Sequence, residues 1–261
     1  MFDLVDNLRA WTPNFMLMFT RLAAMVLTLP VISYPVISPR IRIFIALGLT
    51  LLLFPMFTPT TPVPGSLGGL VLAVGREALV GLTIGFGTKM IFESLHMAGS
   101  FVGRQMGLEM AQVMDPTTLH QVPMLSQFWL LVVIMMFLAV DGHHLLIGVV
   151  VRSFNLIPVG GGFFPPALGR SIVNGGSMTF SLALRFAAPV MTLLLLVDTA
   201  IALVARVMPQ MNVFFVTLPL KIGAGLFGLV ISLDIFQLFF DMFYSDLISF
   251  VETNITHLAA G

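Results

Sequence analysis

The sequence predicts an all-α integral membrane protein with about six helical regions, several of them kinked or broken. Of its 261 residues, 58% are hydrophobic and only 9% are charged, whereas a soluble domain carries about 25% charged residues. The mean hydropathy is +1.04. The apolar stretches are continuous and do not alternate with polar residues, which favours helices over strands inside a membrane.

Two acidic residues precede the first basic one, so we expect the first apolar stretch to be a retained anchor and not a cleaved signal. The second stretch would reach only ~22 Å at 1.5 Å per residue, short of the ~30 Å hydrocarbon core. Prolines interrupt the first, fifth and sixth stretches, at Pro30, Pro35, Pro189 and Pro219. The six expected helical regions are residues 15–37, 43–57, 67–91, 123–151, 177–207 and 213–243.

Charged residues also lie within the apolar stretches. Each charge near the centre of a bilayer costs at least ~2.5 kcal/mol on insertion scales. We therefore expect these helices to pack against other protein subunits and not to face lipid alone. The residues concerned are Arg21, Arg76, Glu77, Arg185, Asp198 and Asp234.

The basic residues predict an orientation in the membrane. The connections at 57–66 and 155–169 are uncharged loops rich in Pro and Gly, whereas the alternate connections are basic. By the positive-inside bias, the basic connections are cytoplasmic and both termini face outside. Arg152 and Arg170 lie against this bias. The residues that set the orientation are Arg40, Arg42, Lys89, Arg104, Arg206 and Lys221.

Composition and motifs argue against several classes of function. Twelve basic and twelve acidic residues balance, so the chain has no basic field for nucleic acid. It has no cysteine, which excludes disulfides and thiolate metal sites. It also lacks the motifs of serine hydrolases, zinc proteases and nucleotide-binding loops. We therefore expect no enzymatic activity, no cofactor and no metal.

Two polar clusters are the candidates for chemistry. Glu93 and His96 have the Glu-x-x-His spacing of a di-iron site, but that site needs a second copy, so a polar helix face is favoured. Asp141, His143 and His144 are residue types that bind metals or relay protons. A glycine between them lies where a helix would break, so a helix-end turn is favoured there.

A glycine-lined helix face leads into a flexible segment in the middle of the chain. Gly99, Gly103 and Gly107 recur at every fourth position and are expected to let another backbone approach closely. The residues that follow are rich in Met, which conforms to varied partners, and include an Asp-Pro break. We interpret them as a gate segment that includes Gln105, Met106, Gly107, Leu108, Glu109, Met110, Met114, Asp115 and Pro116.

The last third of the chain is predicted to be a helical hairpin. Counting outward from a polar turn at 206–212 places Asp198 level with Lys221, and Arg185 level with Asp234, to about one helical turn. Opposite charges at one depth are the usual way in which ions are tolerated in a membrane. We predict that these two ion pairs set the register of the hairpin; contact of each charge with a different subunit is the alternative. The turn residues are Arg206, Pro209, Gln210 and Asn212.

Several motifs in one order resemble the FliR family of flagellar export-gate proteins, which has a homologue in virulence type III secretion. The resemblance extends from the first apolar stretch to the last. The motifs are Gly-Ser-Phe-Val-Gly-Arg-Gln-Met-Gly-Leu at 99–108, Asp-Pro-Thr-Thr at 115–118, Gln-Val-Pro-Met-Leu-Ser-Gln at 121–127, Phe-Leu-Ala-Val-Asp-Gly-His-His-Leu-Leu at 137–146, and Arg-Val-Met-Pro-Gln-Met-Asn-Val-Phe at 206–214.

This resemblance implies a FliP-like helical part at 1–175 fused to a FliQ-like hairpin at 176–261. It implies a complex with FliP-type and FliQ-type subunits and FlhB, with an FlhA-type component nearby, in the flagellar basal body at the bacterial inner membrane. Unfolded flagellar proteins would be the transported substrate. Residues 105–121 would be the plug that helps to close the channel, and the 206–212 turn would face the cytoplasm near FlhB. Glu109 departs from the small or neutral residue expected there.

Two other classes of function compete with this interpretation. A secondary transporter of a small molecule or ion would use broken helices and buried charges as its binding site, but it predicts two matching halves, which this chain lacks. An intramembrane hydrolase would use Asp141 with His143 or His144, but no nucleophile or complete metal set accompanies them.

Overall fold

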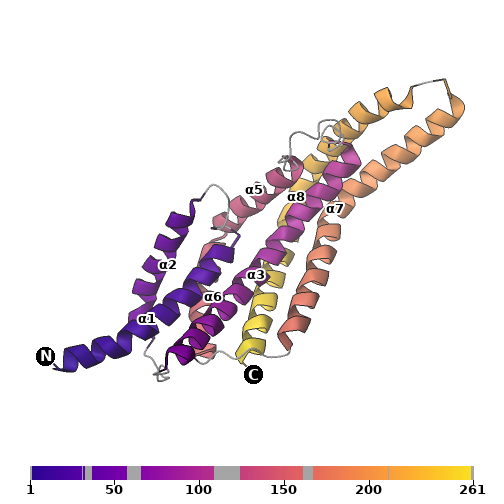
Figure 1. Cartoon of the computed structure of the whole chain (residues 1–261). Coiled ribbons are helices and arrows are strands. Elements are labelled where there is room, and N and C mark those ends of the chain that lie inside the picture. The colour runs from indigo at the N-terminus through magenta and orange to yellow at the C-terminus, as the bar shows by residue number, and fades with distance from the viewer. Residues whose placement is uncertain are drawn as a thin grey trace, which may run out of the picture. The chain divides into compact units, whose positions relative to one another are not determined.

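The computed structural model describes residues 2–30, 32, 37–57, 66–108, 124–160, 167–210 and 212–259. Every element within these ranges is a helix, and none of them is a strand (Figure 1). The elements are α1 (Phe2–Thr28), α2 (Pro39–Leu53), the 3-10 turn η1 (Phe54–Met56), α3 (Leu67–Met106), α5 (Met124–Ala139), α6 (Gly142–Leu156), α7 (Ala167–Val207) and α8 (Val213–Ala259).

The all-α membrane fold predicted from composition is confirmed. Four helical stretches are long and apolar enough to cross a membrane, and the bent pair α5–α6 gives a fifth candidate if it is one span. The four are Pro39–Met56, Leu67–Met106, Ile172–Val207 and Val213–Ser232. Each of the six regions expected from the sequence contains helix, and the fourth region is divided into α5 and α6.

One expectation about the helices was wrong. The second region does not fall short of the membrane by as much as expected, because helix begins at Pro39 and continues to Met56, 18 residues in all, or about 27 Å. Pro189 and Pro219, which interrupt the apolar stretches of the sequence, each lie inside a continuous helix. Membrane helices accept proline where neighbouring groups satisfy the freed backbone carbonyl.

The chain divides into two compact units that do not follow sequence order. Unit 1 contains Met1–Met90, Phe137–Gly176 and Leu247–Gly261, and unit 2 contains Ile91–Met136 and Ser177–Asp246. Helices α3 and α8 each contribute to both units. The division into functional parts at 1–175 and 176–261 stays a prediction.

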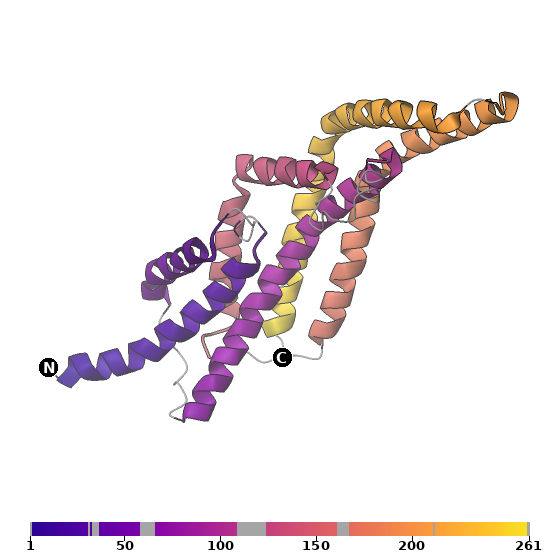
Figure 2. The same ribbon diagram turned by 45° about the horizontal axis from the view of Figure 1, so that its top comes forward.

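Unit 1 is built where α1 packs against α2, α6 and the first half of α3 (Figures 1 and 2). Its core includes Leu17, Leu22, Met25 and Ile84, which are each 1% exposed. Two glycines one turn apart on α3 make the α1 crossing close. A Cβ atom on Gly81 would collide with the backbone oxygen of Arg21, and one on Gly85 would lie 2.9 Å from the oxygen of Met25. This is the small-residue packing typical of membrane helices.

Unit 2 contains the end of α3, most of α5, α7 and the larger part of α8. Leu95, Val102, Trp129, Val190 and Leu194 form part of its buried core. Helices α7 and α8 leave large apolar side chains on their outer faces. Leu195, Leu203, Phe215, Phe227 and Val230 are each more than 59% exposed within the chain.

The break between α5 and α6 has a defined local cause. The two helices are bent by 75°, and Asp141 between them has φ 58°, in the left-handed region that Asp tolerates better than most residues. Gly142 follows, and a Cβ atom there would collide with the buried ring of Phe137. The helix-end turn favoured from the sequence is therefore the structure observed at this cluster.

Candidate functional site

The end of helix α3 is fixed immediately before the predicted gate segment. Gly107 has φ 80°; its N–H donates to the Arg104 oxygen at 3.0 Å, and the Leu108 N–H donates to the Gly103 oxygen at 3.1 Å. These two bonds and the left-handed glycine form a Schellman motif, which satisfies the last carbonyls of a helix. Gly107 therefore ends the helix and does not continue the glycine face predicted for 99, 103 and 107.

A close helix crossing holds the other end of the same segment. A Cβ atom on Gly99 would lie 2.6 Å from the Cα atom of Ser126, so α3 and α5 touch backbone to backbone at this point. The hydroxyl groups of Ser100 and Ser126 are 2.8 Å apart and hydrogen-bonded. Gly103 is also buried. The close approach predicted for the glycine face is thus present at Gly99, with the first turn of α5 as the partner.

The side chain of Met106 anchors the last turn of α3. Met106 is 0% exposed, and its Cγ, Sδ and Cε atoms would each lie 2.6 Å from a Cβ atom on Gly225 of α8. Gln105 is half-buried, and Leu108 is 39% exposed. The predicted gate therefore begins at a rigid point within unit 2. Glu109, Met110, Met114, Asp115 and Pro116 lie outside the described residues.

The hairpin of α7 and α8 contains an ion pair that links its two helices. Lys221 Nζ lies 2.6 Å from Asp198 Oδ1, with side-chain exposures of 19% and 37%. The pairing of these two residues, deduced by counting from the turn, is the pairing in the structure. Arg185 lies on α7, and the side chain of its predicted partner Asp234 lies outside the described residues, so that second pair stays a prediction.

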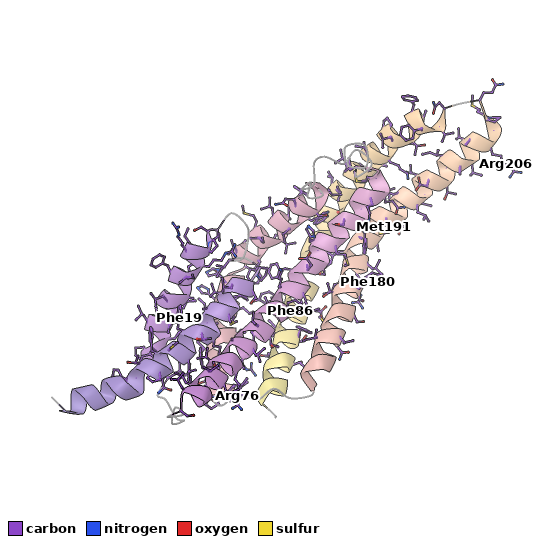
Figure 3. All side chains as sticks on the ribbon, viewed as in Figure 1. Phe19, Arg76, Phe86, Phe180, Met191 and Arg206 are labelled. Carbon is purple, nitrogen blue, oxygen red and sulfur yellow. The ribbon has the colours of Figure 1, made fainter. Side chains whose placement is uncertain are left out.

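The turn of the hairpin is exposed. Helix α7 ends at Val207 and α8 begins at Val213, and Arg206 lies close to the tip (Figure 3). The predicted turn residues Arg206, Pro209, Gln210 and Asn212 are all exposed within the chain. A polar surface of this kind is available for another protein or for solvent.

A fully buried ion pair in unit 1 was not predicted. Arg21 of α1 binds Glu77 of α3 through two contacts, Nε to Oε2 at 2.5 Å and Nη2 to Oε1 at 3.0 Å, and the side chains are 1% and 0% exposed. Arg21 Nη1 also donates to the carbonyl oxygens of Ser153 and Ile157 at the end of α6. The Gly160 N–H donates to Glu77 Oε1 at 2.7 Å.

This arrangement satisfies both buried charges. A bidentate arginine–carboxylate pair with further hydrogen bonds is the geometry that tolerates burial. The guanidinium also lies 4.5 Å from the centre of the Phe154 ring, which adds a cation–π contact. One feature of the sequence could have indicated this pair, because Arg21 and Glu77 are opposite charges within separate apolar stretches.

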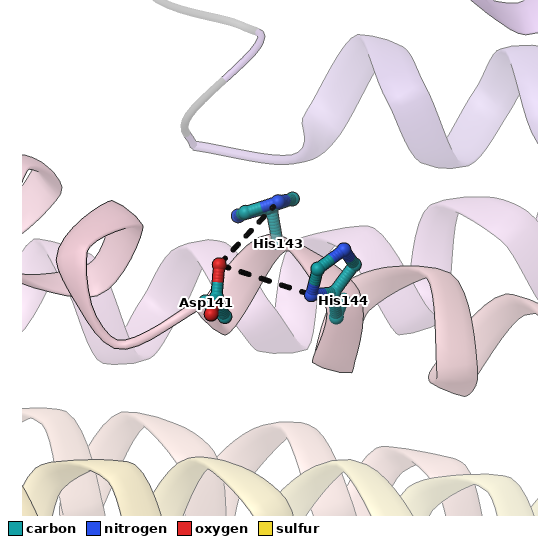
Figure 4. Close-up of side chains that lie close together, drawn as sticks. All are labelled: Asp141, His143 and His144. Atoms are coloured by element: carbon teal, nitrogen blue, oxygen red, sulfur yellow. Dashed lines mark ion pairs between the residues drawn. The ribbon is translucent and has the colours of Figure 1, made fainter.

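The cluster of Asp141, His143 and His144 forms a small group on the surface (Figure 4). Asp141 Oδ1 is 3.9 Å from His143 Nε2 and from His144 Nδ1, and the three ligand atoms lie within 4.8 Å of one another. Ligands around a tetrahedral zinc ion would lie about 3.4 Å apart. Asp141 and His144 are 72% and 70% exposed, as expected for a turn. Elsewhere, Glu93 Oε1 contacts His96 Nδ1 at 3.1 Å on the polar face of α3.

Arg152, which lay against the predicted orientation, has an acidic partner. It forms an ion pair with Glu252 of α8 within unit 1. A paired arginine still counts in the positive-inside bias, but its charge is balanced locally.

Long apolar helices, close glycine crossings and paired intramembrane charges together define a helical integral membrane protein. Residues 12–247 match the model of the family described as bacterial export proteins, family 1. The chain is 35% identical to the flagellar biosynthetic protein FliR of Bacillus subtilis over 231 residues, which are 85% of this chain and 87% of the relative. It is 35% identical to FliR of Caulobacter vibrioides (84% and 87% covered) and 28% identical to FliR of Escherichia coli (95% of each).

The chain therefore belongs to the FliR family of bacterial export proteins. This membership identifies a component of flagellar protein export, and the apolar helices make it a membrane-embedded one. The resemblance drawn from the sequence motifs is confirmed.

Proposed function

We propose that this protein is a structural component of the flagellar type III export gate, which helps to form and close the channel for unfolded flagellar proteins. One observation carries the proposal. Residues 109–123 are joined to the helix end capped at Gly107 on one side and to α5, which crosses α3 at Gly99, on the other. We propose that these fifteen residues, which begin and end on packed helices of unit 2, move aside when a substrate enters the channel.

The composition of this connection supports a closing role. It contains Met110 and Met114, whose unbranched side chains adapt to irregular surfaces. A seal that admits varied unfolded chains needs contacts of this kind, because it has to re-form after each substrate passes.

The exposed apolar helices support assembly with other subunits. Only 17% of the residues in the candidate spans within α7 and α8 are buried inside the chain. The charged side chains of Asp198 and Lys221 nevertheless lie between these helices. We infer that FliP-type and FliQ-type subunits cover much of this surface, in the basal body at the bacterial inner membrane. Residues 1–175 would be the FliP-like part and 176–261 the FliQ-like hairpin.

The polar turn at 206–212 would meet FlhB on the cytoplasmic side, with an FlhA-type component nearby. We expect no catalysis and no cofactor, so the energy for transport would come from the proton-motive force and other subunits. Membership of an export family favours this role over the small-molecule transporter considered from the sequence.

Cysteine cross-linking tests the gate directly, because the chain has no cysteine of its own. A flagellar substrate with a folded C-terminal fusion and one cysteine would be stalled in the channel in cells that carry Met110→Cys or Met114→Cys. Val173→Cys is the matched control, since Val173 is 71% exposed on α7 and lies outside the proposed plug. We expect an oxidant-dependent adduct with both gate variants and none with the control.

Absence of an adduct at both gate positions, with the stalled substrate shown to block export, would contradict the proposal. Native mass spectrometry of a tagged copy tests the assembly separately. A complex holding one copy of this chain with several small helical membrane proteins is expected. A stable monomer or homodimer without partners would favour the alternative function of a secondary transporter.

A further inference from the structure

Unit 1 contains an apolar cavity that the export role does not use. Its volume is about 180 Å³, and its lining offers no polar surface. Helices α1, α2 and α6 form its walls, through side chains that include Val26, Leu29, Ile45, Leu49, Leu146 and Val150. Ile147 also lines it and is 40% exposed, so the cavity opens on the outer surface of the unit.

Such a cavity calls for an apolar occupant. An engineered cavity of about 150 Å³ lined by similar residues stays dry and binds benzene, and this cavity is larger. Helix α2, which forms one wall, is a candidate membrane span that exposes Phe44, Leu51 and Leu52. In a membrane, the molecules that meet this surface in greatest number are lipid acyl chains.

Two arginines lie at the start of α2, beyond the residues that line the cavity. The C-terminal end of α1 and the N-terminal ends of α2 and α6 lie at the same end of unit 1 (Figures 1 and 2). Arg42 lies one turn before Ile45 on the cavity side of α2, and Arg40 is exposed two residues earlier. His143 lines the cavity from the first turn of α6, and its Nδ1 atom is buried without a hydrogen-bond partner in the described part of the chain.

We propose that this cavity binds one acyl chain of an anionic membrane phospholipid, whose phosphate is held at Arg40 and Arg42. The charges are complementary, because two arginines and the positive end of the α2 helix dipole lie where the headgroup would emerge. Asp141 is directed at His143 and His144, 3.9 Å from each, and is not part of the lining. The inference depends only on the membrane location and is independent of the gate proposal.

Native mass spectrometry of the purified, delipidated full-length chain tests the site. The chain would be titrated with dioleoylphosphatidylglycerol and, separately, with dioleoylphosphatidylcholine. Ile147→Trp fills the cavity from its half-exposed rim, and Val150→Phe fills it from within. Leu52→Trp adds the same bulk as the first variant on an exposed face of α2 that does not line the cavity.

We expect the wild type to bind one phosphatidylglycerol at least tenfold more tightly than Ile147→Trp does, and Leu52→Trp to match the wild type. Arg40→Gln combined with Arg42→Gln should reduce affinity for phosphatidylglycerol to that for phosphatidylcholine. Arg76→Gln, which removes an exposed cation of α3, should leave the preference intact.

Three results would overturn the proposal. The first is a wild-type chain that retains neither lipid. The second is unchanged phosphatidylglycerol binding in Ile147→Trp and Val150→Phe variants that keep wild-type helicity and elute as single species. The third is loss of subunit co-purification in Ile147→Trp with lipid binding intact, which would assign the cavity to a protein partner.

Discussion

Two of the ion pairs that link helices in the described part of this protein differ in almost every physical respect. Arg21 and Glu77 in unit 1 are 1% and 0% exposed, with two mutual contacts and three backbone hydrogen bonds around them. Lys221 and Asp198 in unit 2 are 19% and 37% exposed and make one contact. The first pair is enclosed by its own chain, and the second is open to whatever covers the hairpin.

This difference separates a structural core from an adaptable surface. Removing one member of a buried pair costs about 3–5 kcal/mol, because it leaves an uncompensated charge. A partly exposed pair contributes about 0–1 kcal/mol. Unit 1 therefore holds helices α1, α3 and α6 in one arrangement, whereas the α7–α8 hairpin can re-pair its charges when neighbouring subunits bind.

The largest effect is expected from Glu77→Gln. This change removes the charge that balances the buried guanidinium of Arg21 and should destabilise the chain by about 3–5 kcal/mol. Thermal unfolding in detergent, followed by circular dichroism, measures it. The double variant Arg21→Met with Glu77→Leu should recover only part of the loss, because the carbonyls of Ser153 and Ile157 lose their donor. Wild-type stability of Glu77→Gln would show that the pair is not enclosed as described.

Gly81→Ala should cause the second-largest loss of stability. Its new Cβ atom would collide with the backbone oxygen of Arg21, and overpacking of this kind costs about 1–3 kcal/mol. Gly75→Ala is the matched control on the same helix, because a Cβ atom there meets nothing within 4 Å. The control should be neutral or stabilising by up to about 1 kcal/mol. Equal melting temperatures for the two variants would contradict the close crossing.

Gly107→Ala should have a moderate effect on stability and a clear effect on export. A left-handed conformation costs an L-residue roughly 1–2 kcal/mol, so the last turn of α3 should fray. Gly107→Asn should lose less, since Asn is the common alternative at this position of the motif. Secretion of a flagellar hook protein into the medium would rank the variants. If Ala exported better than Asn, the capping role would be wrong.

Charge exchange at the hairpin should give a smaller effect. Asp198→Lys and Lys221→Asp each create a repulsive pair and should reduce co-purification of partner subunits, whereas the double exchange should restore it. Because the pair is partly exposed, the change in stability of the isolated chain should stay within about 1 kcal/mol. A double variant that assembles no better than either single variant would assign each charge to a different subunit.

The smallest effect is expected at the Asp141 turn. Replacement of His144 by Asn keeps a polar side chain there and should leave swimming motility unchanged. The exposure of Asp141 and His144 and their 3.9 Å contact explain this expectation. Loss of motility with normal assembly would instead point to chemistry at this cluster.

Much of the fold could be predicted because membrane helices can be recognised in a sequence from the length and the apolar composition of a stretch. Continuous apolar stretches located the helices of the described residues to within part of each, and the separation of Asp198 and Lys221 from one turn predicted their pairing. Proline was a weaker guide, since Pro189 and Pro219 lie within continuous helices. Counting along one hairpin cannot reach Arg21 and Glu77, because α1 and α3 are separated by α2 and their register depends on tertiary packing.

The candidate site was predicted in part for a similar reason. A glycine's sequence position does not reveal whether it serves a crossing or a cap. Gly99 meets Ser126 at a crossing, Gly107 ends its helix in a left-handed conformation, and both fit the same four-residue spacing. Gly81 and Gly85 share this spacing and make the α1 crossing, but no motif drew attention to them.

The buried Arg21 network also determines when α1 can reach its final position during biosynthesis. Glu77 is synthesised 56 residues after Arg21, and Ile157 follows Arg21 by 136 residues. At about 5–20 residues per second, roughly 3–11 s pass before the carboxylate exists and roughly 7–27 s before the last carbonyl does. Helix α1 is therefore synthesised before the carboxylate and the carbonyl groups that will bind its arginine. Its final position has to wait for α3 and α6 to leave the ribosome.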